Sequence, residues 1–216
     1  MNHKSLLITR PFYENPTNYL FWWSELLVKL AKEKVFEISD LKNKKVTRKE
    51  VEGRLKKMKP SLVVFNGHGD DNSIYGQDDE MLISIGFNDH LLIDKIIFAR
   101  SCLSAKNLGK ACVKLGTTSY IGYDEDFVFI FDIDYVSKPL LDKTARLFLE
   151  PSNQVVRSLL KGNLTSYANN SGKEMFLKNI TSLLTSETTK EDSSILRYLV
   201  WDMKHQVCLG DQNAKI

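Results

Sequence analysis

Continuous apolar segments restrict most strongly what this chain can fold into. Residues 62–65 (LVVF) and 95–99 (KIIFA) consist almost entirely of apolar side chains, and Asn66 and Gly67 follow the first segment. A strand of this kind is buried on both faces, which is typical of a parallel sheet covered by helices on two sides. The two segments therefore predict strands of a mainly parallel sheet.

Helical patterns separate the predicted strands. Three segments have the spacing or the end signals of helices, namely residues 18–34, 47–58 and 105–115. Further strands are predicted at residues 6–8, 35–38 and 119–121, with a small hairpin within residues 73–86. Strands that alternate with helices predict an α/β fold, here a three-layer α-β-α sandwich with a mainly parallel central sheet.

The last third of the chain has a less regular pattern. We expect helices at residues 132–149, 153–160 and 174–184, polar loops at 163–174 and 185–194, and a final strand and turn at the end of 194–209. No internal repeat or linker is recognisable in the 216 residues. A single domain spanning residues 1–216 is therefore expected.

Composition excludes several classes of protein. The chain is 43% hydrophobic and 26% charged with a net charge of +3, which argues against general disorder and against a nucleic-acid-binding protein. We find no signal peptide and no apolar run near the roughly 18 residues of a membrane span. Three cysteines without metal-ligand spacing favour a reducing cytoplasm, with no metal and no cofactor.

Two predicted strand ends carry reactive side chains. His68 lies between Gly67 and Gly69, and Cys102 follows the strand at residues 95–99. Ligands of open α/β sheets bind at the carboxyl ends of the strands, so adjacent parallel strands would present both side chains on one edge. An imidazole activates a thiol by accepting its proton, and the amides of Gly69 and Cys102 then form an oxyanion hole.

These blocks resemble a known family. VVFNGHG and IIFARSCLSA, followed by LGTTSYIGYDEDF and LVWDMKHQVCLGD, are similar to caspase-like cysteine peptidases of the gingipain-like and CHAT-type branches. The resemblance covers most of the chain and implies that His68 is the general base and Cys102 the nucleophile. It also implies a peptide bond as substrate and an acyl-enzyme intermediate without cofactors. The Gln-Ala-Cys pattern of caspases is absent.

Two signals in the sequence give opposite predictions for the substrate residue before the cut. An acidic cluster that includes Asp124 and Asp126 follows the strand after the nucleophile, where the resemblance implies an acid that pairs with a basic residue before the cut. Arg10 follows the first strand, where caspases place an arginine that binds aspartate. We favour a basic residue, because a pocket acid rejects acidic side chains.

Function is predicted in two main forms. The first is a cytoplasmic cysteine endopeptidase that cuts a protein partner by limited proteolysis, in prokaryotic defence or programmed cell death, under an activating or inhibitory protein partner. The second is a catalytically inactive caspase-like domain that binds proteins. A flavodoxin-like or nucleotide-binding domain is a weaker alternative, because ITRPFYENP offers no glycine-rich phosphate loop.

Overall fold

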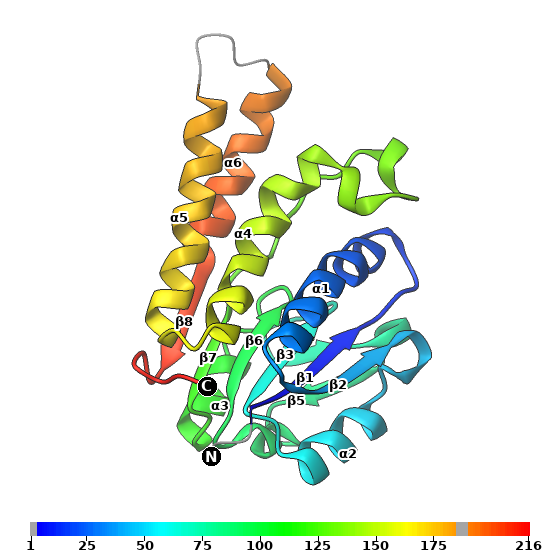
Figure 1. Cartoon of the computed structure of the whole chain (residues 1–216), viewed down its shortest axis with the longest axis vertical. Helices are drawn as coiled ribbons and strands as arrows, with labels where there is room; N and C mark the ends of the chain where they lie inside the picture. The colour runs from blue at the N-terminus through cyan, green and yellow to red at the C-terminus, as the bar shows by residue number, and fades with distance from the viewer. Residues whose placement is uncertain (1–3, 185–189) are drawn as a thin grey trace.

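A six-stranded sheet forms the centre of the computed structural model, which describes residues 4–184 and 190–216 (Figure 1). The strands run in the order β2-β1-β3-β6-β7-β8, and only β8 is antiparallel to its neighbour. Their bounds are β1 (Ser5–Arg10), β2 (Glu37–Lys42), β3 (Leu62–Asn66), β6 (Ile96–Arg100), β7 (Ser119–Tyr123) and β8 (Gln206–Gly210). The predicted hairpin is confirmed as β4 (Ser73–Tyr75) and β5 (Met81–Ser84).

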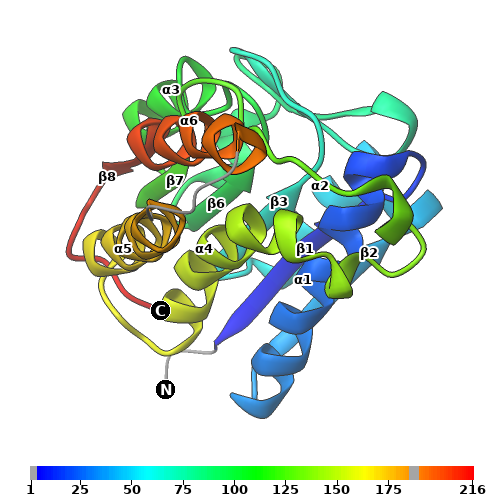
Figure 2. The ribbon, with the colours of Figure 1, turned by 90° about the horizontal axis from the view of Figure 1, so that it is seen from above.

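Helices cover both faces of this sheet, which confirms the predicted α-β-α sandwich. One face packs on α1 (Asn15–Glu33), α4 (Lys143–Leu160) and α5 (Thr165–Leu183), which lie along the same side of the sheet in Figure 2. The other face packs on α2 (Arg48–Met58), α3 (Leu108–Leu115) and the hairpin. The last helix, α6 (Lys190–His205), packs against α5 and leads into β8.

The sheet register positions the two predicted reactive residues. β3 and β6 are adjacent and parallel, with Leu62 opposite Ile96 and Asn66 opposite Arg100. Both strands therefore end at the same edge of the sheet, and the chain segments that follow them lie side by side. No helix within the described residues is long and apolar enough to cross a membrane.

The two helices predicted around Pro151 are wrong, because one helix, α4, runs through the proline. A proline has no N–H to donate to the carbonyl four residues earlier, which here belongs to Leu147. Asn179 of α5 donates its side-chain amide to that carbonyl at 2.7 Å. Residues 132–142, predicted helical, instead form short turns that include η4 (Ile133–Tyr135) and η5 (Pro139–Leu141).

The loop predicted at residues 163–174 is also wrong, because most of it belongs to α5. Asn, Ser and Gly are weak helix formers, so the local sequence favours a loop. Packing of α5 against α4 overrides this local preference. A Cβ on Gly172 would lie 2.6 Å from a methyl group of Val155. Only glycine therefore allows the two helices to approach this closely. The loop predicted at residues 185–194 lies partly outside the described residues, and α6 already begins at Lys190.

Candidate active site

A pocket of about 250 Å³ opens at the edge of the sheet where β3 and β6 end. His68 and Cys102 both line it, so the structure brings these two predicted residues together. The remaining walls come from the start of α1 and from residues 127–131, which follow β7. Most of the lining side chains are apolar, which favours exclusion of water around a bound ligand.

The two glycines beside His68 are required by close backbone approaches. Gly67 has a φ of +143°, and a Cβ there would lie 2.4 Å from the carbonyl oxygen of Tyr75. A Cβ on Gly69 would lie 2.6 Å from the carbonyl oxygen of Cys102. The second contact presses the segment after β3 against the segment after β6. Among the described residues, the amides of Gly69 and Cys102 have no hydrogen-bond partner.

Glu14 is a site residue that sequence reasoning missed. It is the N-cap of α1, and its carboxylate forms a hydrogen bond with Nε2 of His68. The contact fixes the orientation of the imidazole ring and leaves Nδ1 for a second partner. The two residues lie 54 positions apart, and the available signal was only that Glu14 follows β1 at the same sheet edge.

The thiol of Cys102 lies beneath the segment that follows β7. It donates a long hydrogen bond of 3.8 Å to the carbonyl of Phe127 and has no bond to His68. Burial raises the pKa of the Cys102 thiol to about 11, and the negative charges of Asp126 and Asp202 add to this rise. The thiol is therefore protonated at neutral pH in this arrangement.

Backbone strain occurs next to the thiol. Leu103 has a φ of +58°, in the left-handed region that side chains other than those of glycine and asparagine rarely adopt. Its amide donates to the carbonyl of Glu125 at 3.0 Å, which holds the turn against the segment after β7. Such a conformation is unfavourable by about 1 kcal/mol and occurs frequently at functional sites.

The acidic cluster after β7 is divided between two environments. Asp124 binds Nδ1 of His205 at 2.8 Å and faces α6 and β8, so it does not line the pocket. Asp126 is exposed, and its carboxylate lies close enough to Cys102 to act on the thiol. Asp202 of α6, which sequence reasoning missed, is buried beside them and accepts a hydrogen bond from Val128 at 3.0 Å.

The structure places Arg10 away from this pocket. The side chain is fully buried and pairs with Glu25 at 2.5 Å and Asp40 at 3.3 Å, with its guanidinium 4.2 Å from the centre of the Phe21 ring. Its charge is thus compensated within the fold. The predicted role of Arg10 in binding an acidic substrate residue does not fit this position.

Arg100, at the end of β6, lines the pocket instead and was not singled out from the sequence. It is fully buried and donates to Ser152 at 2.8 Å and to Asn153 at 2.5 Å. It has no carboxylate partner among the described residues, and burial lowers its pKa to about 10. No group of three His, Cys, Asp or Glu side chains suited to hold a metal ion occurs among the described residues.

The sheet order, the covering helices and the pocket at the strand ends define an α/β protein of the caspase-like fold. Among solved structures, the chain is similar to the Arg-specific cysteine proteinase gingipain R (RgpB), with 13% identity, a TM-score of 0.65, and coverage of 99% of this chain and 47% of that chain. It is also similar to the complex of Porphyromonas gingivalis RgpB pro- and mature domains, with 11% identity, a TM-score of 0.60, and coverage of 99% and 48%.

This chain therefore spans about half the length of the gingipain chains that it matches. At this level of identity the likeness concerns the fold and not the individual site residues. No family model matches the sequence, and no curated protein matches it.

Proposed function

We propose that the chain is a cysteine endopeptidase that uses His68 and Cys102 to cut a protein partner by limited proteolysis. The observation that supports this most directly is the pocket itself, which a thiol and an imidazole from two neighbouring strand ends line together. The likeness in fold to a cysteine proteinase agrees with this reaction class.

The proposed reaction follows from the groups present. His68 accepts the proton of the Cys102 thiol, and the thiolate attacks the carbonyl carbon of the peptide bond. The amides of Gly69 and Cys102 donate to the oxyanion, and the protonated His68 gives its proton to the leaving amine. Water then hydrolyses the acyl-enzyme. The reaction uses no metal or organic cofactor.

Covalent labelling tests the proposal. We expect a peptidyl chloromethyl ketone ending in Arg to add once to the wild-type chain and not to Cys102→Ala, as read by intact mass. Cys208→Ala is the matched control, because Cys208 is the other partly exposed thiol, and it should label like wild type. An adduct that survives in Cys102→Ala would contradict the assignment of the nucleophile.

The inactive, protein-binding alternative has one observation in its favour. The Cys102 thiol bonds to Phe127 and has a raised pKa, so it is not prepared for attack in this arrangement. Absence of labelling by Arg, Asp and Leu probes alike is expected both of this alternative and of a peptidase that awaits an activating partner. Unchanged binding of a partner by Cys102→Ala, without cleavage of that partner by the wild-type chain, would favour the inactive form. Labelling with any of these probes would support the peptidase.

The covered thiol also fits a peptidase that a partner protein must release. We propose that an activating partner moves residues 127–131 away from Cys102, and that the enzyme acts in defence or programmed cell death. Broad digestion of unfolded casein by the purified chain at neutral pH would contradict this restraint.

We propose further that the residue before the cut is basic. The exposed Asp126 acts on the thiol electrostatically, whereas burial raises the pKa of Asp202 and Arg10 is paired elsewhere. A substrate with a cationic side chain before the cut would be attracted most strongly by this negative charge. The gingipain R of the matched structure is named as Arg-specific, which agrees with the proposal.

Replacing Asp126 with alanine should reduce kcat/KM for peptides with Arg or Lys before the cut by about tenfold, and should spare peptides with Leu there. Competition between fluorogenic peptides with Arg, Lys or Leu before the cut gives the ratio of their kcat/KM values directly. Asp124→Ala is the comparison from the same loop, and we expect a smaller effect because His205 holds its carboxylate. Unchanged selectivity would remove Asp126 from the site, and a wild-type preference for acidic residues would direct attention to Arg100.

A further inference from the structure

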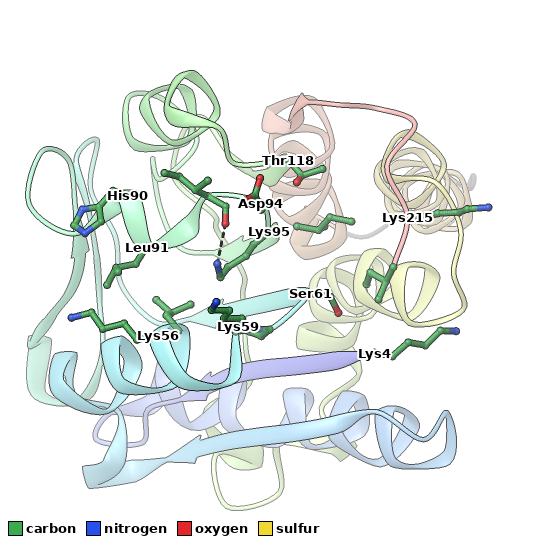
Figure 3. A pocket seen from close by; sticks show the side chains of 15 residues that line it. Lys4, Lys56, Lys59, Ser61, His90, Leu91, Asp94, Lys95, Thr118 and Lys215 are labelled. Carbon is green, nitrogen blue, oxygen red and sulfur yellow. Dashed lines mark hydrogen bonds between the residues drawn. The ribbon is translucent and has the colours of Figure 1, made fainter. Parts of the chain in front are cut away.

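A second pocket, of about 710 Å³, opens at the opposite edge of the sheet from His68 and Cys102 (Figure 3). Its walls come from residues at the amino ends of four adjacent strands: Lys4 before β1, Ser61 before β3, Lys95 before β6 and Thr118 before β7. The end of α2, the segment at residues 90–94 and the C-terminal residues complete it. Its volume lies in the range of small-molecule sites.

The charges around this pocket are strongly unbalanced. Five lysines line it, whereas Asp94 contributes the one carboxylate side chain among its lining residues, beside the main-chain carboxylate of Ile216; the lysines are Lys4, Lys56, Lys59, Lys95 and Lys215. Among the described residues, only Lys56 of these five has a carboxylate partner, Glu52 at 3.1 Å. An excess of unpaired positive charge around a hollow produces a local potential that attracts anions.

Lys59 and Lys95 form the centre of this charge. Figure 3 shows their side chains ending toward each other near the centre of the pocket, while Lys4, Lys56 and Lys215 lie at its periphery with their ends directed away from the centre. Lys95 is half-buried, and its ammonium group donates to the carbonyl of Ile93 at 2.9 Å. Burial lowers the pKa of Lys95, and the neighbouring charge of Lys59 lowers it further while that of Asp94 opposes it.

A solvated helix face does not explain this pair. Lysines in the last turn of a helix, such as Lys56 and Lys57 of α2, complement the helix dipole and need no ligand. Lys59 is the C-cap residue of α2, whereas Lys95 belongs to no helix, so the dipole of α2 does not account for the two together. Apolar side chains that include Leu55 and Ile96 line the same pocket. A pocket lined by both charged and apolar side chains suits a ligand with an anionic part and an apolar part.

We propose that this pocket binds a phosphorylated small molecule of nucleotide size, whose phosphate groups lie between Lys59 and Lys95. Lysine ammonium groups bind phosphates as point charges, and two of them facing one hollow favour a ligand with at least two negative charges. The apolar part of the ligand contacts Leu55 and Ile96. The site is separate from the proposed catalytic pocket and does not depend on it.

Calorimetric titration of the whole chain with ATP tests this proposal, with pyrophosphate and adenosine as probes of the two parts. We expect ATP to bind more tightly than either probe, and the double variant Lys59→Gln/Lys95→Gln to weaken ATP binding at least tenfold. Lys57→Gln is the matched control, because it removes one exposed charge from the same end of α2 but does not line the pocket.

Three results would overturn the proposal. One is no binding of ATP at millimolar concentration to the wild-type chain. Another is equal weakening in Lys57→Gln and in the double variant, which would indicate attraction by net charge only. The third is binding of a single-stranded oligonucleotide, lost in the double variant, without binding of ATP; this would identify a nucleic-acid surface instead. Circular dichroism of both variants establishes that they remain folded.

Discussion

Replacing His68 with alanine should lower kcat/KM for a peptide substrate by about 10⁴-fold, because the thiol then lacks the group that accepts its proton and protonates the leaving amine. The loss should be large because burial and nearby acids already disfavour the thiolate of Cys102. Single-turnover kinetics on a peptide that the wild-type enzyme cuts would measure the effect.

Tyr167→Ala is the control for this variant, because it removes an exposed ring from α5, far from the pocket residues. It should retain wild-type activity. A His68→Ala enzyme that keeps more than about a tenth of wild-type kcat/KM would exclude His68 as the general base.

Replacing Glu14 tests the role of His68 in a second way. Its carboxylate orients the His68 ring, so Glu14→Ala should reduce kcat/KM by about 10- to 100-fold through misplacement of the ring. Glu14→Gln keeps a hydrogen-bond acceptor and should restore part of the loss. Equal activity of wild type and Glu14→Ala would limit the role of Glu14 to capping α1.

The second large effect concerns stability. Arg10→Ala should lower the free energy of unfolding by about 3 kcal/mol, because it removes a fully buried cation and leaves Glu25 and Asp40 close together with the partly exposed Lys42 as their remaining cationic partner. It also removes the guanidinium that lies over the ring of Phe21. Urea unfolding followed by tryptophan fluorescence would give the value.

Arg54→Ala provides the matched control for Arg10. Arg54 is half exposed and pairs with Glu50 one turn away on α2, so its loss should change the free energy of unfolding by about 0.5 kcal/mol or less. If Arg10→Ala unfolded like wild type but changed the preference before the cut, the structural role of Arg10 would be wrong and a substrate-binding role would return.

Short segments of the sequence were sufficient to predict the core of the sheet. Residues 62–65 are apolar throughout and 95–99 are apolar after Lys95, and this composition favours burial of both faces. Because β3 and β6 are adjacent and parallel, the residues that follow them meet at one edge. The sequence predicted that His68 and Cys102 each follow a buried strand, and the pairing of the two strands in the structure places both residues at one pocket.

Helix boundaries in the last third could not be predicted in the same way. Pro151 normally ends a helix, and the stretch before Gly172 favours a loop. Asn179 supplies the hydrogen bond that the proline cannot make, and Val155 packs directly against Gly172. Both partners belong to a different helix, so no local pattern contains this information.

The sequence by itself determined the α/β architecture and the position of His68 and Cys102 after two buried strands, because periodicity and strand ends are local properties. Only the tertiary structure decided which charges are compensated and which are not. It paired Arg10 with Glu25 and Asp40, joined Glu14 to His68, and placed Phe127 over the thiol. The partner of a charged group is chosen by distance in the folded chain, and such distances depend on how the layers pack.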